Sequence, residues 1–457
     1  MNNPFARVYE QLPQTSPYHI ENAQKLDTAI KNLYERTKQS PTRFAEKKAI
    51  CDLITSYVSH PDFLENETIQ AAQIKILKVV MFGSFLTELA AADSDVDICV
   101  AVIGKGRHRH TFLQAIYDDF RNQTPIYRKF FQSKNVRVIN YVDGATVPIV
   151  KLMIDGIPID ISCSISTQPP SIYFAAKLIN AYCQFDPRLP KLVFFIKNWL
   201  KLVAGTFNST RLFPNSYATT LMIIHCLQRH KVLPNLYRIH NDMFNPKIKR
   251  NWDSVVYNDS FKSPLSATEI ERLKRDVPPN HSTVFQLFVL FLRHYADRQV
   301  LYNNRLQMSK ANLVPKNWLR YQEIQIDDPF DTKNPGRSVI STEEICIVFE
   351  IALNAISNPE RRDLFNELMK ISSKSVTQVR QRWSVNNAVW CVSQQQQQQT
   401  QQGFQVSNMQ PRPTLRQPLT QASYYGLTSP APSMQQPQQQ QPIQPYYQQR
   451  QQYYHLF

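Results

Sequence analysis

Two aspartates, one residue apart, have the spacing of ligands for a divalent metal ion. Asp95 and Asp97 flank Val96 and precede an apolar run. Successive side chains of a strand point to opposite faces, so both carboxylates project to one face while Val96, Ile98 and Val100 face the other. The pattern predicts that two carboxylates meet at one metal site.

A third acid is expected, because a two-metal displacement on phosphorus needs a carboxylate at the metal that activates the attacking hydroxyl. The segment 157–164, Ile-Pro-Ile-Asp-Ile-Ser-Cys-Ser, alternates strictly between apolar and other residues. This alternation predicts a strand with Ile157, Ile159 and Ile161 inward and Asp160 on the opposite face. Asp160 is therefore the predicted third ligand, and the predicted chemistry is metal-dependent phosphoryl transfer.

Gly83 and Ser84 lie upstream of the paired acids, after an apolar strand. A Gly-Ser turn that leaves a strand can present backbone N–H groups and a hydroxyl at a helix N-terminus, where partial positive charge suits a triphosphate. The chain has only 9 glycines in 457 residues, so a glycine here is informative. Each fragment alone is more often a plain turn or an exposed strand end, but together they indicate a nucleotide-polymerising site.

The motifs resemble those of the template-independent cytoplasmic poly(A) polymerases and their terminal uridylyltransferase relatives, in the DNA polymerase beta nucleotidyltransferase superfamily. The germline-development type of poly(A) RNA polymerase is the most similar. The Gly-Ser, Asp-x-Asp and distant Asp of that family correspond to Gly83, Ser84, Asp95, Asp97 and Asp160. Segments 145–152 and 186–188 also resemble family blocks. The resemblance implies Mg²⁺ or Mn²⁺ at the three aspartates and a nucleoside triphosphate as substrate.

Further nucleotide-binding residues follow from the same resemblance. Lys197 and Lys201 stand one helical turn apart and match lysines that hold the triphosphate; the alternative is a solvated basic face. Ser216 matches a phosphate-binding hydroxyl. Tyr217 matches a ring that stacks on the base, and a buried core tyrosine is its alternative.

The segment 326–337 resembles the nucleotide-recognition motif of the poly(A)-polymerase-associated region. Asp328 and Asn334 are its weaker candidates for reading or positioning the base. Uridylylating relatives usually place a histidine in or near this loop, and segment 326–337 contains none. ATP is therefore the expected substrate.

Three positions depart from the family pattern. Ser164 and Ile165 stand where paired asparagines usually follow the third aspartate, and isoleucine cannot donate a hydrogen bond to a ribose hydroxyl. Glu88 stands near a position that favours glycine, where a carboxylate would repel the triphosphate unless it points to solvent. Lys333 is typical of neither branch.

The elements that must position these residues suggest an α+β chain of four parts. We expect N-terminal helices over 1–60 that pack on the central domain, and a nucleotidyltransferase catalytic lobe with a mixed sheet over 61–168. A mainly helical central domain over 169–390 would contain the poly(A)-polymerase-associated region at about 280–340. A disordered glutamine-rich tail is expected over 391–457, because this segment has too little aliphatic content to form a core. Pro169-Pro170 would mark a hinge between lobe and central domain.

Charge indicates a polyanionic partner. The formal net charge is +16, which favours RNA over a membrane surface. The basic segment 105–110 follows the strand of the paired acids and is expected near the active cleft, where it could contact RNA; a solvated loop is equally compatible. No dedicated RNA-binding module is visible, so we expect the enzyme to act on RNA 3′ ends with a separate RNA-binding protein that supplies target specificity.

Cysteine usage and the ends of the chain bear on location. The 7 cysteines are scattered without a Cys-x-x-Cys pair, which suggests a reducing compartment, and His108 and His110 have no companion cysteines at zinc spacing. Zinc is not expected. There is no signal-peptide pattern and no apolar run long enough to span a bilayer. The expected location is the cytoplasm, with RNA granules as a further location suggested by the tail.

The sequence thus predicts a polynucleotide adenylyltransferase that adds AMP from ATP to RNA 3′ ends. A terminal uridylyltransferase of the same fold remains an alternative. A catalytically weak scaffold of an RNA-regulatory complex is a further alternative, suggested by Glu88 and Ile165, against which the three intact acids argue.

Overall fold

The computed structural model describes residues 17–381 except for short gaps at 145–146, 166–170, 208–211, 246–258, 317–322, 340, 359–362 and 373. The chain divides into two units, and the larger one comprises Met1–Val376 with Phe457. Of the other unit, Thr377–Leu456, only residues 377–381 are described. The expected tail at 391–457 and the expected hinge at Pro169-Pro170 therefore lie outside the described residues.

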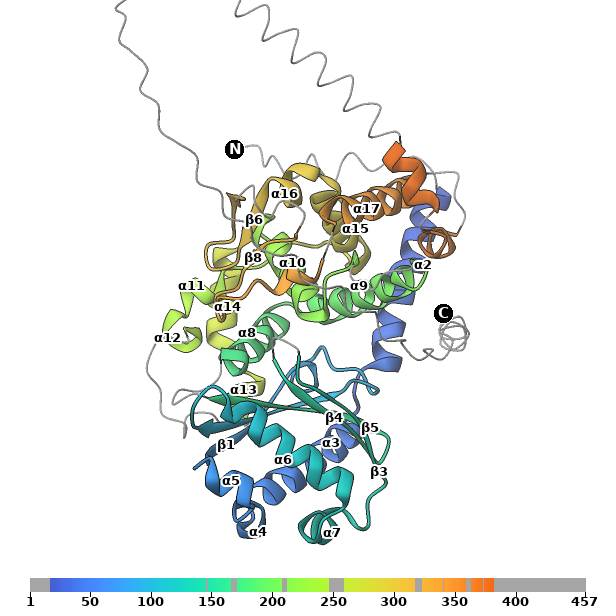
Figure 1. Ribbon diagram of the computed structural model, residues 1–457. Coiled ribbons are helices and arrows are strands. Elements are labelled where there is room, and N and C mark those ends of the chain that lie inside the picture. Colours follow the sequence, from blue (N-terminus) through green and yellow to red (C-terminus); the bar gives the residue numbers. More distant parts are fainter. Residues whose placement is uncertain are drawn as a thin grey trace, which may run out of the picture. The chain divides into compact units, whose positions relative to one another are not determined.

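A five-stranded mixed sheet forms the α/β lobe (Figure 1). Its strands are β1 (Lys75–Phe82), β2 (Val96–Ile103), β3 (Val136–Val142), β4 (Ile149–Ile154) and β5 (Ile157–Ile165), in the order β1-β2-β5-β4-β3. β2 and β5 run parallel, and every other neighbouring pair is antiparallel. The strands expected before Gly83, at the paired acids and over 157–164 are present as β1, β2 and β5, and the parallel β2–β5 pair brings together two segments far apart in the chain.

Helices cover this sheet because its strands expose apolar side chains. In β5, Ile157, Ile159 and Ile161 are buried, as the alternation predicted. Helix α6 (His108–Asn122) packs against β3, β4 and β5, with Phe112 and Ile116 fully buried beneath it (Figure 1). The other helices of the lobe are α3 (Pro41–Val58), α4 (Pro61–Leu64), α5 (Glu67–Ala71) and α7 (Pro125–Phe131).

The second part of the described chain is mainly helical. Its helices are α8 (Ser171–Phe185), α9 (Arg188–Ala204), α10 (Ser216–Arg229), α11 (Leu236–Ile239), α12 (Asn241–Phe244), α13 (Asp259–Lys262), α14 (Ala267–Asp276), α15 (Val284–Ala296), α16 (Arg298–Tyr302), α17 (Thr342–Ser357) and α18 (Leu364–Met369). A small sheet of order β7-β6-β8 joins them, formed by β6 (Asn304–Gln307), β7 (Asn312–Pro315) and β8 (Ile326–Asp327). The core of this helical part includes Trp199 on α9. The Trp199 ring meets the Phe288 ring edge-on and lies tilted against the Phe349 ring.

The two N-terminal helices pack on different parts of the molecule. Helix α2 (Pro17–Thr37) contacts α9, α15 and α18, as expected for the segment 1–60. Helix α3 instead packs on the α/β lobe, so the prediction is wrong for that helix. The reason is Tyr57, whose ring packs on Phe63, Phe120 and Phe131 and whose hydroxyl donates a 2.7 Å hydrogen bond to Asp119 of α6.

Helix α3 also holds the turn that leads into β2. The ammonium of Lys47, which is fully buried, donates hydrogen bonds to the Ala91 carbonyl and the Ser94 hydroxyl at 3.1 and 2.9 Å. Burial lowers the pKa of Lys47 to about 8, and Asp93 and Asp95 oppose that shift. Lys47 thereby positions the residue next to Asp95, a role that the sequence analysis missed.

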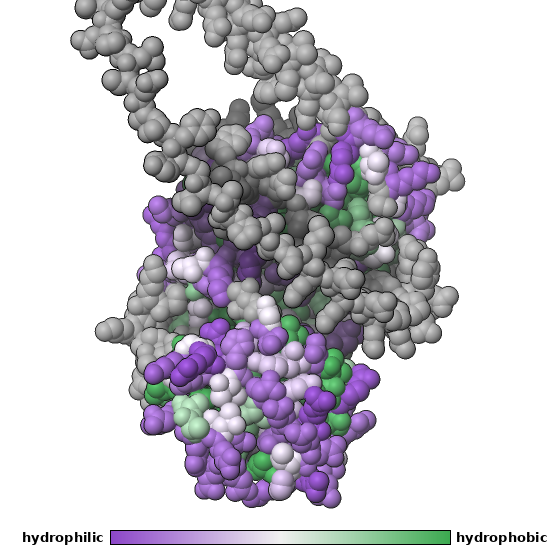
Figure 2. Space-filling view, in the orientation of Figure 1, coloured by the Kyte–Doolittle hydropathy of each residue, from purple (hydrophilic) through white to green (hydrophobic). Residues whose placement is uncertain are grey.

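The described surface on the face shown in Figure 2 is mainly hydrophilic, with apolar residues scattered among polar ones. The exposed large apolar side chains are Ile103, Ile139, Val147, Ile239 and Tyr302. Within the described ranges, no helix combines the length and the apolar character that crossing a membrane requires.

Replacing the buried lysine tests its role in the fold. Lys47→Met should lower the free energy of unfolding by about 1–3 kcal/mol, because buried acceptors lose their donor. The melting temperature in a thermal scan reports this loss. Lys48→Met is the matched control: Lys48 is partly exposed and pairs with Asp52, so its loss should cost about 0–1 kcal/mol. Equal effects of the two substitutions would contradict a positioning role for Lys47.

Candidate active site

The turn after β1 brings the backbone against an acidic side chain. Gly83 has φ +83°, and a Cβ atom placed there would lie 2.0 Å from Oδ2 of Asp97. Only glycine fits both the conformation and the contact. Ser84 then begins η1 (Ser84–Leu86), a short 3-10 turn rather than the helix whose N-terminus the sequence suggested. A turn of this length offers local N–H groups but little macrodipole.

Strand register brings the three aspartates together. In the parallel β2–β5 pair Asp97 stands opposite Asp160, and in the antiparallel β1–β2 pair Phe82, next to Gly83, stands opposite Asp97. Asp95 precedes β2 by one residue. One carboxylate oxygen from each of Asp95, Asp97 and Asp160 lies within 4.8 Å of the others.

Crowding of these carboxylates changes their protonation. Burial, followed by the charges of Asp95 and Asp160, raises the pKa of Asp97 to about 8. Partial burial and then the Asp160 carboxylate raise the pKa of Asp95 above its ordinary value. The triad therefore favours any cation that can share its charge, and three oxygen donors are the ligand type that Mg²⁺ and Mn²⁺ prefer.

Lys151 is the cation that already faces this cluster. It lies opposite Asp160 in the β4–β5 register, and the two side chains form an ion pair. Its charge also lowers the pKa values of Asp95 and Asp97, against the larger effect of burial. Lys151 falls in segment 145–152, whose resemblance to a family block gave this lysine no role; only the strand register shows that it faces the acids.

The two predicted phosphate-binding lysines of α9 differ in position. Lys197 is half-buried, burial lowers its pKa, and the Asp95 carboxylate opposes this shift, so Lys197 lies close enough to the triad to feel its charge. Lys201, one turn further along, is exposed, and among the described residues no contact links it to the carboxylates. The structure brings Lys197 to the acids and leaves Lys201 at the surface.

Ser216 and Tyr217 begin α10, whose N-cap is Asn215. The Asn215 side chain accepts a 2.9 Å hydrogen bond from the Ala218 N–H and donates a 3.1 Å bond to the Pro335 carbonyl. Ser216 is exposed, which leaves its hydroxyl available.

Tyr217 lines a largely apolar pocket together with Tyr182, Pro329 and Phe330. Burial and the adjacent Asp328 carboxyl raise the pKa of the Tyr217 hydroxyl. Burial also raises the pKa of Asp328 to about 6. The predicted stacking residue Tyr217 thus lies beside Asp328, one of the two side chains predicted to read or position the base.

Asn334 has a different role from the one predicted. Its side-chain oxygen accepts hydrogen bonds from the N–H groups of Ile326 and Gly336, at 3.0 and 2.9 Å, and its amide nitrogen donates to the Ile324 carbonyl at 2.9 Å. These bonds shape the loop before η5 (Pro335–Ser338), so the structure assigns Asn334 to the loop's architecture rather than to base reading. Gly336 is required beside it, because a Cβ there would lie 2.3 Å from the Ile324 carbonyl oxygen.

The structure also shows where Glu88 and the basic segment 105–110 lie relative to the three acids. Glu88 is exposed and its carboxylate lies near the Tyr34 hydroxyl, so it points to solvent, the orientation in which it would not repel a triphosphate. The basic segment 105–110 follows the end of β2 opposite to Asp97, about 20 Å along the strand. The expectation that this segment lies near the active cleft is wrong, because the strand carries the chain away from the three acids.

The raised pKa of Asp97 predicts pH-dependent metal binding. Its ordinary value is 3.8, so between about pH 4 and pH 8 the metal-free folded chain holds a proton that the unfolded chain has lost. Stability of the metal-free protein should therefore fall as pH rises through this window. A metal ion must displace that proton, so Mn²⁺ affinity should rise about tenfold per pH unit up to about pH 8.

Calorimetric titration of Mn²⁺ across this range measures the effect. Asp97→Asn should lose both the affinity and its pH dependence. A Mn²⁺ affinity that stays constant between about pH 6 and pH 8 in the unaltered protein would contradict the raised pKa of Asp97.

Comparison with known proteins shows what the chain is similar to. Residues 26–184 match the model of the central palm domain of mitochondrial-like poly(A) RNA polymerase. Human terminal uridylyltransferase 7 is 26% identical over 56% of this chain, and fission yeast terminal uridylyltransferase cid1 is 24% identical over 68%. The inactive non-canonical poly(A) RNA polymerase protein Trf4-2 of Drosophila melanogaster is 32% identical over 44%. These matches span 16%, 73% and 48% of the respective relatives, so much of the human and fly proteins has no counterpart here.

Solved structures show the same fold over most of the chain. A GLD-2/RNP-8 complex gives a TM-score of 0.54 at 18% identity, covering 77% of this chain and 99% of that one. Cid1 with its product ApU gives 0.51 at 19% identity, covering 76% and 98%. The α+β fold is thus that of the GLD-2 and Cid1 structures, and residues 26–184 are similar to the central palm domain of mitochondrial-like poly(A) RNA polymerase.

Proposed function

We propose that this protein adds AMP from ATP to the 3′-hydroxyl of RNA. The observation that carries the proposal is the convergence of Asp95, Asp97 and Asp160 beside the Gly83 turn. The fold and the palm-domain match support nucleotidyl transfer as the reaction class. In this reaction the RNA 3′-oxygen attacks the α-phosphorus, a phosphodiester forms, the α–β anhydride breaks, and pyrophosphate leaves.

The position of each side chain suggests its role in the proposed reaction. Asp95 and Asp97 would hold both metal ions, and Asp160 would hold the one beside the attacking hydroxyl and favour loss of its proton. When bound, the ions neutralise charge that develops on the phosphoryl oxygens. Lys197 lies close to the acids and is the lysine best placed for the triphosphate; Ser84 and Ser216 are further candidates. Such chemistry depends mainly on positioning and electrostatics.

The proposal of adenosine is based on the base-reading loop. Segment 326–337 contains no histidine, and Asp328 lies beside Tyr217, whose ring would stack on the base. The palm-domain model bears a poly(A) polymerase name, which supports this choice. Uridylyl transfer is the second candidate, because two matched relatives are named terminal uridylyltransferases.

RNA is the proposed acceptor, and a separate RNA-binding protein is the proposed partner. The net charge of +16 favours a polyanion, and the similar GLD-2 structure is a complex with RNP-8. A partner that holds the message would raise the local concentration of its 3′ end. The cytoplasm is the proposed location.

Nucleotide incorporation onto a short RNA tests the reaction and the base together. With Mg²⁺ or Mn²⁺, kcat/KM for ATP should exceed that for UTP by about tenfold or more. Asp97→Asn should reduce kcat/KM on the order of 10³-fold or more, because a bound metal supplies several kcal/mol of transition-state stabilisation.

Asp93→Asn is the matched control, because Asp93 is an exposed acid close to the same strand and should leave the rate nearly unchanged. A higher kcat/KM for UTP than for ATP would contradict adenylyl transfer and favour uridylyl transfer. No extension with any nucleotide or metal, together with an unchanged cellular effect of Asp97→Asn, would favour the scaffold.

A further inference from the structure

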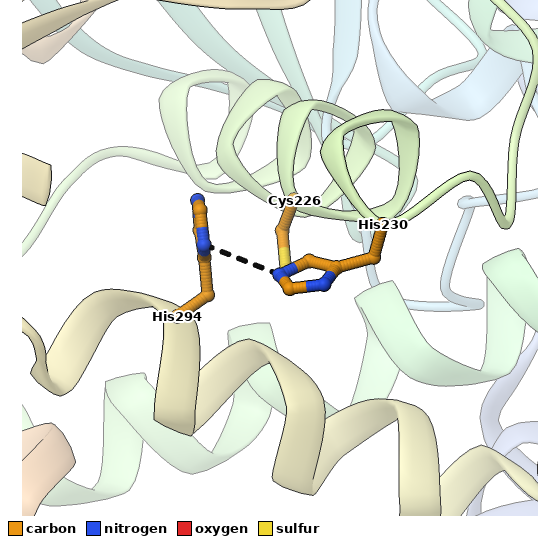
Figure 3. A group of neighbouring side chains, drawn as sticks. All are labelled: Cys226, His230 and His294. Carbon is orange, nitrogen blue, oxygen red and sulfur yellow. Dashed lines mark hydrogen bonds between the residues drawn. The ribbon is translucent and has the colours of Figure 1, made fainter. Parts of the chain in front are cut away.

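A second group of metal-ligand side chains lies in the helical part, outside the aspartate site. Cys226 and His230 stand four residues apart at the C-terminal end of α10, so they share one helix face. His294 lies in the last turn of α15, which packs against α10. Figure 3 shows the His294 ring from α15 facing the His230 ring, with the Cys226 sulfur beside it. One ligand atom from each residue lies within 4.8 Å of the others.

The separation of the two imidazoles suits a tetrahedral ion. Nε2 of His230 and Nδ1 of His294 are 3.3 Å apart and share a hydrogen bond. Two histidine nitrogens bound to one Zn²⁺ at 2.0–2.1 Å stand about 3.3–3.4 Å apart in tetrahedral geometry. The rings already have this spacing, so an ion could replace the shared proton without moving either helix.

The two imidazoles are in the neutral form that binds a metal, whereas burial raises the pKa of the Cys226 thiol, which must lose its proton when a metal binds. Burial, and after it the neighbouring histidines and Arg229, lowers the pKa of His294 to about 3. Burial and Arg229 also lower the pKa of His230. Neutral imidazoles present lone pairs to a metal.

The surrounding backbone also favours a cation. The C-terminal ends of α10 and α15 meet at this group, and helix C-termini carry partial negative charge. The nearby positive charge of Arg229 disfavours a bound cation. Conversion of the Cys226 thiol to a thiolate on metal binding would offset that charge.

We propose that Cys226, His230 and His294 bind a zinc-class transition metal ion that clamps the end of α10 to the end of α15, with the fourth position taken by water. A thiolate and two imidazoles suit Zn²⁺, whereas the aspartate triad suits Mg²⁺ or Mn²⁺, so the two sites take different ions. Helix α10 carries Ser216 and Tyr217 at its other end, so the clamp would steady the helix that presents them. Zinc was not expected from the sequence, because there is no Cys-x-x-Cys pair and the Cys226-x-x-x-His230 spacing gains a third ligand only when α15 brings His294 to it.

Cobalt substitution in the full chain tests the site without relying on activity. The background is Asp97→Asn, which weakens the carboxylate site. After chelation, added Co²⁺ should give the thiolate-to-cobalt charge-transfer band and the intense visible absorption of a tetrahedral site, and Zn²⁺ should abolish both. Zinc should also raise the melting temperature, because it binds the folded chain alone.

Two variants and one control distinguish a metal site from a packed cluster. Cys226→Ala should lose the charge-transfer band and the zinc-induced rise in melting temperature. Cys183→Ala, at an equally buried cysteine on α8, should keep both. His230→Gln, at a partly exposed position with less risk to folding, should lose the retained zinc measured by elemental analysis. Absence of the band in the background protein, or unchanged band and zinc content in Cys226→Ala and His230→Gln, would overturn the proposal.

Discussion

Three carboxylates held around one point repel one another, and much of the α/β lobe is arranged to hold them there. The parallel pairing of β2 with β5 places Asp97 opposite Asp160, and the antiparallel β1 brings Gly83 against the Asp97 carboxylate. The cost of this crowding appears in the raised pKa of Asp97, which reaches about 8. Lys151 relieves part of it by pairing with Asp160, and a divalent ion would relieve more.

The supports of this cluster come from segments far from it in sequence. Lys47 of α3 fixes the turn before Asp95, and Asn180 of α8 donates a 3.2 Å hydrogen bond to the Leu86 carbonyl of η1. These contacts tie the strand ends and the Gly83 turn to helices on either side. The acids therefore need no large adjustment to share an ion, which is the arrangement that positional catalysis of phosphoryl transfer requires.

The helical part presents its candidate nucleotide-binding residues through a second set of backbone contacts. Asn215 caps α10 and bonds to Pro335, while Asn334 holds Ile324, Ile326 and Gly336. The start of α10 and the loop before η5 are thereby fixed to each other. The proposed preference for adenine depends on this junction, where Tyr217 meets Asp328, and the proposed metal clamp would act at the opposite end of the same helix.

Local patterns in the sequence were sufficient for the strands, the three acids and the Gly83 turn. Apolar alternation at 157–164 and around Asp97 decides which side chains share a face, because strand periodicity is a property of neighbouring residues. The resemblance of motifs supplied the candidate lysines and Tyr217. It could not tell half-buried Lys197 from exposed Lys201, or a base-reading Asn334 from one that shapes its own loop.

Tertiary structure alone decided the rest. Lys151 faces Asp160 because of a strand register, α3 joins the α/β lobe because Tyr57 finds partners on α6 and α7, and segment 105–110 lies far from the acids because β2 runs away from them. His294 meets Cys226 and His230 only because α15 packs on α10. Each of these outcomes depends on contacts between residues distant in the chain, whereas the periodicity of a single segment reports only which way its own side chains point.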